Sequence, residues 1–111
     1  MNIAGLIIWL LSVGICAASF AAISIWAKKR TTPMHFWSGE TIPADKVADI
    51  PAWNAAYAKM WGIYAALFGI DAVLAFWSMT AAVVLLMILC TAGIAGLVIA
   101  NAKIRKKYMV K

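Results

Sequence analysis

The chain reads MTAAVVLLMILCTAGIAGLVIANA at residues 79–102, a stretch without a single charged side chain. A helix of about 20 apolar residues spans the hydrocarbon core of a bilayer. Two further stretches precede it: residues 3–27, which are also uncharged, and residues 60–77, whose single charge is Asp71. Because a helix satisfies its own backbone hydrogen bonds inside lipid, each stretch is expected to be a membrane-spanning helix.

The composition agrees with this expectation. The chain is 66% hydrophobic and only 13% charged, with a mean hydropathy of +0.91, whereas soluble domains are nearer half apolar and a quarter charged. We therefore predict an all-α membrane protein with three transmembrane helices in a single domain. The predicted parts are helix 1 at about 3–28, a cytoplasmic loop at 31–50, helix 2 at about 51–77, helix 3 at about 79–103 and a basic tail at 104–111.

The basic residues predict the orientation. With the N-terminus outside, all ten Lys and Arg fall on or near the cytoplasmic side, as the positive-inside rule requires. The prediction is therefore N-out and C-in, with helices 2 and 3 forming an antiparallel hairpin around the very short connection at Ser78. Lys28 and its basic neighbours follow the first apolar stretch instead of preceding it, so this stretch is expected to be retained and not cleaved as a signal peptide.

The net charge of +6 is explained by the same residues. Basic side chains beside a membrane span fix its orientation and touch anionic lipid head groups, and no nucleic-acid partner is needed to account for them. The residues expected to meet lipid head groups are Lys28, Lys29, Arg30, Lys103, Arg105, Lys106 and Lys107.

Asp71 is the sharpest feature of the predicted spans. An ionisable side chain at this depth costs about 2.5–3.5 kcal/mol and is a functional hypothesis by default. It lies roughly 9 Å inside the span, counted from Trp77, and no basic residue of the chain lies at that depth. Trp9 and Ser12 reach a similar depth on helix 1 and are possible hydrogen-bond donors. The two readings are a proton or cation site, with Tyr64 nearby, and a structural hydrogen bond between helices.

Helix 2 carries a stripe of polar and aromatic side chains spaced by three or four residues, which places them on one face. The stripe consists of Asn54, Tyr57, Trp61, Tyr64, Phe68 and Asp71. It predicts either a ligand groove or a packing face. The candidate ligand or partner face combines Asn54, Tyr57 and Trp61 with His35 and Trp37 of the loop. Trp53, one residue before the stripe, is expected in the aromatic belt at the membrane interface.

Small residues form two further stripes, which permit close helix approach in lipid but also arise by chance where alanine is abundant. Gly14, Ala18 and Ala22 form the first, and Ala92, Gly96 and Ala100 form the second. We expect the second stripe to meet a neighbouring helix.

Nothing in the sequence supplies catalytic chemistry. Cys16 and Cys90 fall in apolar stretches and form no C-x-x-C pair, which indicates inert packing. His35 and the acidic residues of the loop match no compact metal-binding spacing. We therefore expect no enzyme activity, no cofactor and no metal.

Three segments carry a family resemblance. Residues 34–39 read MHFWSG and residues 49–62 read DIPAWNAAYAKMWG, with KKYMVK at 106–111. In these segments the chain resembles a family of small three-span bacterial inner-membrane proteins of unknown function, which implies a bacterial inner-membrane location and no activity. The loop that leads into a Trp- and Asn-bearing helix is also similar to that of membrane immunity proteins that protect bacilli from their own toxin, although their Gly-x-Arg-Thr segment is absent here.

The leading functional prediction is a non-enzymatic binding or scaffold protein that acts through its cytoplasmic loop and the helix 2 face, as a homo-oligomer or with a membrane-protein partner. The alternative is an oligomeric small transporter or channel that uses Asp71. A channel requires Asp71 to face a water-filled axis, whereas a scaffold buries it against protein.

Overall fold

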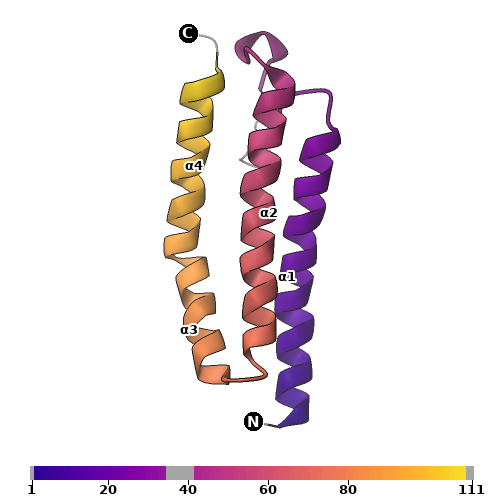
Figure 1. The fold of residues 1–111 in the computed structure, drawn as a ribbon, viewed down its shortest axis with the longest axis vertical. Helices are drawn as coiled ribbons and strands as arrows, with labels where there is room; N and C mark the ends of the chain where they lie inside the picture. The colour runs from indigo at the N-terminus through magenta and orange to yellow at the C-terminus, as the bar shows by residue number, and fades with distance from the viewer. Residues whose placement is uncertain (1, 35–41, 110–111) are drawn as a thin grey trace.

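The structure, a computed structural model, describes residues 2–34 and 42–109. Helix accounts for 83% of the chain and no strand is present among the described residues, which confirms the all-helical prediction. The helices run along one common axis (Figure 1). The long dimension of the molecule is 54 Å, more than the 40–45 Å or so of a bilayer with its head groups.

The first two long helices begin with side-chain caps. Helix α1 comprises Ile3–Lys29, and helix α2 comprises Ile50–Leu74. The Asn2 side chain accepts a hydrogen bond from the backbone N–H of Gly5 at 2.6 Å, and Asp49 does the same for Ala52 at 3.1 Å. Such caps satisfy backbone donors that the first helical turn leaves free.

Helix α2 ends earlier than predicted. It stops at Leu74 instead of residue 77, and the backbone N–H groups of Phe76 and Trp77 bond the carbonyls of Val73 and Leu74 in a tight turn. Ser78 then caps the next helix. This early end leaves room for the reversal that makes α2 and the following helix antiparallel (Figure 1).

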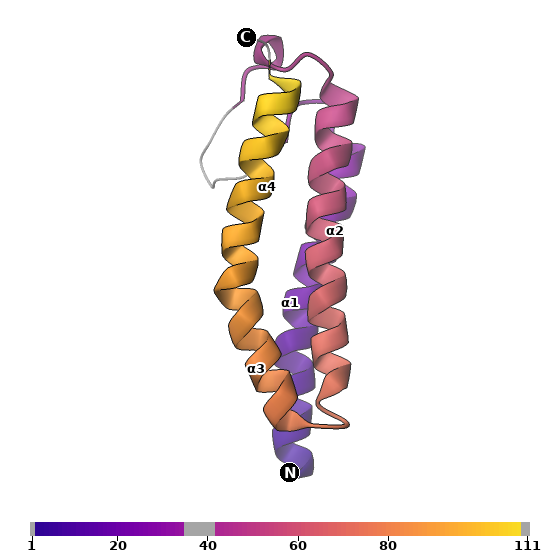
Figure 2. The ribbon, with the colours of Figure 1, turned by 60° about the vertical axis from the view of Figure 1, so that its left-hand side comes forward.

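The third predicted helix is interrupted at Thr91. Helix α3 covers Met79–Cys90 and helix α4 covers Ala92–Tyr108, with Thr91 between them at φ −112° and ψ −79°. The Thr91 hydroxyl donates to the Met87 carbonyl at 2.7 Å. A threonine that bonds the preceding turn in this way bends a helix, which explains the change of direction between α3 and α4 (Figure 2).

Helix α4 also extends beyond the predicted end at residue 103. It continues to Tyr108 and includes three basic residues in its last turn, Arg105, Lys106 and Lys107. Lysine and arginine are good helix formers, and positive charge is favoured at the C-terminal end of the helix dipole. The predicted basic tail is therefore largely helical.

Helix α2 is the central element. Helix α1 lies along one side of it and the α3–α4 arm lies along the other (Figures 1 and 2). The Phe20 ring of α1 packs on α2 against Trp61 at 5.5 Å, Tyr64 at 5.0 Å and Phe68 at 5.1 Å, measured between ring centroids. The Ser24 hydroxyl donates to the Ala58 carbonyl at 2.5 Å. These contacts fix the antiparallel register of α1 and α2.

The segment before α2 closes one end of the bundle. It contains a short 3-10 helix, η1, at Ala44–Lys46, and the backbone N–H of Ala48 donates to the Tyr108 carbonyl at 2.8 Å. Val47 and Met109 form an isolated antiparallel bridge at the same place. The end of α4 is thereby tied to the start of α2.

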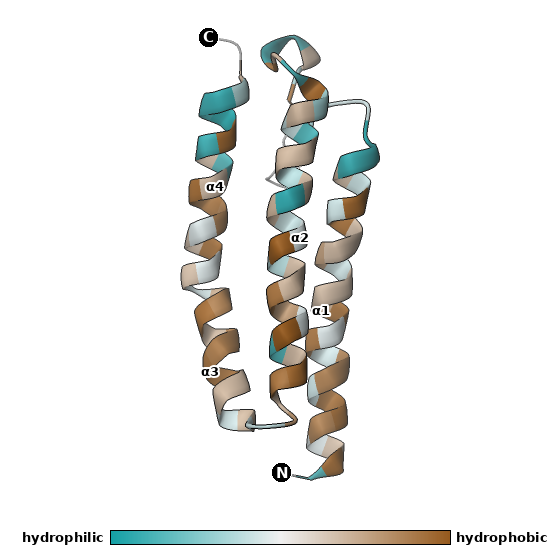
Figure 3. Ribbon diagram, in the orientation of Figure 1, coloured by the Kyte–Doolittle hydropathy of each residue, from teal (hydrophilic) through white to brown (hydrophobic). Residues whose placement is uncertain are grey.

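Two helical segments are long and apolar enough to cross a membrane: Ile3–Lys29, and α3 joined with α4 as Met79–Tyr108. Only 6% and 17% of their most apolar windows are buried within the chain, so neither is an interior core helix of this fold. Hydrophobic residues cover most of the bundle, and hydrophilic ones gather at the end where α1 and α4 finish (Figure 3).

Most residues of the two small-residue stripes make no helix contact within the chain. A Cβ atom added at Gly14 or Gly96 would meet no atom within 4 Å, and Ala92 is exposed. Helix α4 turns Leu97 and Asn101 toward the interior instead, because these larger side chains reach α2 across the wider spacing. Ala100 is half-buried and packs against the core. The expectation that the second stripe meets a neighbouring helix is therefore wrong for Ala92 and Gly96 within this chain, but not for Ala100.

Candidate functional site

The polar and aromatic stripe of α2 faces the interior of the bundle. Its members are Asn54, Tyr57, Trp61, Tyr64, Phe68 and Asp71, and all are buried except Trp61, which is half-buried. Helix α1 lies on one side of α2 and the α3–α4 arm lies on the other (Figure 1). In this structure the stripe is a packing face, and its amide and tyrosine hydroxyl groups bond partners in the same chain.

Asn54 holds the segment that follows α1. Its side-chain oxygen accepts from the backbone N–H of Met34 at 2.7 Å, and its amide nitrogen donates to the carbonyls of Arg30 at 3.3 Å and Thr32 at 2.9 Å. The neighbouring Trp53 indole donates to the Met34 carbonyl at 2.8 Å. Asn54 is 1% exposed and Trp53 is fully buried. Asn54 is thus engaged internally, and Trp53 is a core residue, not part of an interfacial aromatic belt.

Two tyrosines connect α2 to the opposite arm. The Tyr57 hydroxyl donates to the Asn101 side-chain oxygen, and the Tyr64 hydroxyl donates to the Leu89 carbonyl, beside the break at the end of α3. A Cβ atom on Gly93 would lie 3.0 Å from the Tyr64 ring. A larger residue at this position would therefore press on the tyrosine ring that reaches the carbonyl. Asn101 is 6% exposed and was not singled out from the sequence, although a lone amide in an uncharged run is a usable signal.

Asp71, unlike Asn54 and the two tyrosines, has no hydrogen-bond partner within residues 2–34 and 42–109. It is fully buried, yet neither carboxylate oxygen has a hydrogen-bond partner among the described residues. The indole nitrogen of Trp9 is also buried without a partner. Ser12 is exposed. The expected hydrogen bond from Trp9 or Ser12 to Asp71 is therefore not formed.

The rotation of α1 about its own axis explains why Ser12 does not reach Asp71. Val13 is the residue that α1 buries at this level, and adjacent helical residues point about 100° apart. Ser12 is consequently turned away from α2 toward the outside. Depth along the helix was predictable from residue counting, but the rotation of the helix about its axis was not.

Two residues of the predicted partner face, His35 and Trp37, lie outside the described residues. The structure therefore describes this candidate face only through its α2 members, and these are occupied by internal contacts.

The basic residues assemble at one end of the bundle (Figure 3). Lys28, Lys29, Lys103, Lys106 and Lys107 are exposed, whereas Arg30 and Arg105 are half-buried. The Arg30 guanidinium lies 4.3 Å from the ring centroid of Trp26, and the Lys107 ammonium lies 5.2 Å from that of Tyr108. Cations stacked on aromatic rings suit a membrane–water interface, where both groups are favoured.

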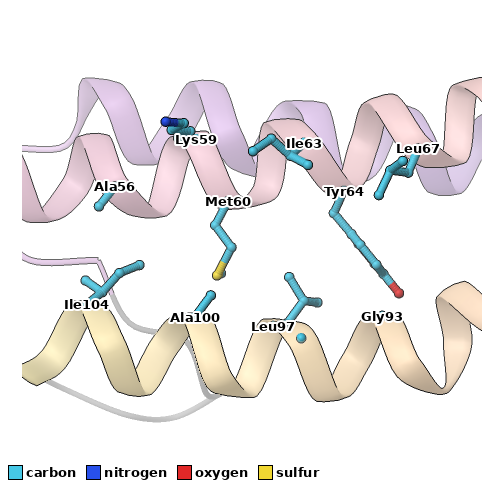
Figure 4. Close-up of a pocket in the computed structure, with 11 residues that line it drawn as sticks. Ala56, Lys59, Met60, Ile63, Tyr64, Leu67, Gly93, Leu97, Ala100 and Ile104 are labelled. Atoms are coloured by element: carbon cyan, nitrogen blue, oxygen red, sulfur yellow. The ribbon is translucent and has the colours of Figure 1, made fainter.

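Two grooves open beside α2 near this end. A groove of about 450 Å³ lies between α2 and α4 and is lined almost entirely by apolar side chains, with Lys59 as the single charged residue (Figure 4). A second groove of about 500 Å³ lies between α1 and α2 and contains both Lys28 and Lys59. Lys59 and Ile63 line both grooves.

No protein-family model matches the chain, and no match was found among curated proteins or solved structures. The resemblance to small bacterial inner-membrane proteins therefore stays a prediction.

Proposed function

We propose that the chain is a three-span membrane protein with its N-terminus outside and its C-terminus inside, in the bacterial cytoplasmic membrane. Two of its helical segments have the length and apolarity for a span, and α2 lies between them on the same axis (Figure 1). The grouping of basic residues at one end supports the orientation, and the family resemblance supports the location.

Cysteine labelling tests the orientation. In a background without Cys16 and Cys90, a cysteine at Ala48 or Lys106 should react with a membrane-impermeant maleimide only after the cells are opened. A cysteine at Met79 should react in intact cells. Labelling of Lys106→Cys from outside would contradict the proposed orientation.

We further propose that the protein is a non-enzymatic binding or scaffold protein that engages a membrane-embedded partner. The observation that carries this proposal is the full burial of Asp71, since a channel requires that carboxylate on a wet axis. The amide and hydroxyl groups of α2 likewise engage their own chain. What the bundle offers outward is apolar: Ile8, Ile88 and Ile99 are 65%, 50% and 56% exposed. Large exposed apolar faces suit contacts with lipid or other membrane proteins.

Photo-crosslinking in the native membrane tests the binding function. Benzoylphenylalanine placed at Ile8, Ile88 or Ile99 samples the outer face of α1, α3 or α4. One face should give a discrete protein adduct, which mass spectrometry identifies as a second copy or another membrane protein, while the other faces crosslink to lipid alone. Lipid adducts from all three positions would contradict a scaffold function.

A second candidate function is supported by one observation at Asp71. A buried carboxyl without a partner costs free energy, and residues retained at such a cost are often functional. Proton transfer through Asp71 predicts a proton flux in vesicles that Asp71→Asn abolishes, because an amide does not titrate. Equal flux for wild type, Asp71→Asn and protein-free vesicles would exclude this candidate.

A further inference from the structure

Lys59 is the charged residue that two grooves share. It lines the apolar groove between α2 and α4 and, together with Lys28, the groove between α1 and α2. Both lysines are exposed. Within residues 2–34 and 42–109, no carboxylate pairs with either ammonium group. Lys28 of α1 and Lys59 of α2 therefore line one groove toward the hydrophilic end of the bundle.

Apart from the lysines, both grooves are lined mostly by apolar residues, with Tyr64 in the α2–α4 groove and Ser24 in the α1–α2 groove as the polar side chains. Ile63 forms the ridge between them. Figure 4 shows Met60 and Tyr64 directed toward α4, with Lys59 and Ile63 on the other side of α2. The α2–α4 groove runs from Ala56 to Leu67, about 16 Å along the helix, close to half of the ~30 Å hydrocarbon core. The length of this groove along the helix thus matches the hydrocarbon thickness of a single leaflet.

We propose that this site binds one anionic phospholipid, with its phosphate on Lys28 and Lys59 and its two acyl chains in the grooves on either side of Ile63. Charge complementarity carries the choice of ligand. An anionic head group matches two unpaired ammonium groups, and acyl chains match groove walls that are mostly apolar. The proposal rests on the proposed function only in requiring a chain embedded in a bilayer.

A helix of a second copy is the competing occupant, and the charges disfavour it. Helices α1, α3 and α4 contain no acidic residue. The single acid within α2, Asp71, is fully buried. No helix of this chain can therefore bring a carboxylate to the two lysines, whereas an anionic lipid brings a phosphate.

Native mass spectrometry of the purified full chain tests the head-group site, with palmitoyl-oleoyl phosphatidylglycerol and the matching phosphatidylcholine as probes. The wild type should retain one phosphatidylglycerol in preference to phosphatidylcholine. Lys28→Gln/Lys59→Gln should weaken phosphatidylglycerol binding roughly thirtyfold, at about fivefold for each lysine near a membrane surface. Lys28→Arg/Lys59→Arg should retain it, which separates loss of charge from loss of folding.

The matched control is Lys103→Gln/Lys106→Gln, which removes the same charge from the same end of the bundle. Both residues are exposed on α4 and line neither groove. This variant should bind phosphatidylglycerol nearly as the wild type does. An equal loss in the two double variants would overturn the proposal, because it would show diffuse attraction without a site.

A pair of glycine variants tests the acyl-chain groove. Gly96 lines the α2–α4 groove, whereas Gly14 lies on α1 outside both grooves, and a Cβ atom added at either position meets no atom within 4 Å. Gly96→Leu should lower the retention of both lipids, and Gly14→Leu should leave it unchanged. Unchanged lipid retention with a shifted monomer–dimer ratio in Gly96→Leu would overturn the proposal in favour of a second copy. Photo-crosslinking of a protein partner is independent of each of these results, so failure of the lipid site leaves the scaffold function standing.

Discussion

Asp71 and Asn54 are buried polar side chains on the same face of α2, and they should respond to mutation with opposite sign. Asn54 makes three hydrogen bonds to backbone groups, whereas both oxygens of Asp71 make none within the described chain. Removal of the Asn54 side chain loses three bonds of about 1 kcal/mol each, so Asn54→Ala should destabilise by about 3 kcal/mol. Asp71→Val removes an unpaired polar group of similar size and should stabilise by about 2 kcal/mol.

Two further variants of Asp71 separate the loss of the carboxyl from changes in packing. Asp71→Ala cannot overpack, so it should be close to neutral, since the gain from removing the carboxyl offsets the small cavity. Asp71→Asn keeps an unpaired polar group, so its stability should differ little from that of the wild type. The measurement is the free energy of unfolding in mixed detergent micelles, followed by helical circular dichroism during titration with sodium dodecyl sulfate. If Asp71→Val and Asp71→Ala both lower the free energy of unfolding by 1 kcal/mol or more, the carboxyl has a partner and the reasoning from its burial fails.

Gly93→Ala should destabilise by about 1 kcal/mol, because the new methyl group would press on the Tyr64 ring at 3.0 Å; Gly96→Ala, with open space around it, should be neutral or slightly stabilising in the same titration. Tyr57→Phe should cost about 1 kcal/mol by removing the hydroxyl that donates to Asn101. A Tyr57→Phe variant as stable as the wild type would show that Asn101 finds another donor.

Several features of the fold were predictable because they depend on local sequence. The apolar stretches marked the helices, and α1 ends at Lys29, one residue from its predicted end. Spacing by three and four residues placed the α2 stripe on one face. The break at Thr91 was not predicted, because a threonine inside an apolar run is usually tolerated. It becomes a break here through its bond to Met87 and the contact of Tyr64 with Leu89.

The candidate site was less predictable than the fold. Residue counting gave Asp71 its depth and showed that no cation lies there. It could not give the rotation of α1, which turns Ser12 outward and Val13 inward. It also could not distinguish the satisfied Asn54 from the unsatisfied Asp71, since both are polar residues on one stripe.

The composition and the spacing of apolar residues thus determined the helical architecture, the apolar outer surface and the gathering of charge at one end. Each of these depends on residues close together in the chain. The placement of Lys28 and Lys59 along one groove, the bond between Tyr57 and Asn101 and the isolation of Asp71 came from the packing of three helices. These depend on which faces meet and at what register. That choice is made by contacts such as Phe20 against the α2 aromatics, which join residues far apart in sequence and leave no local pattern.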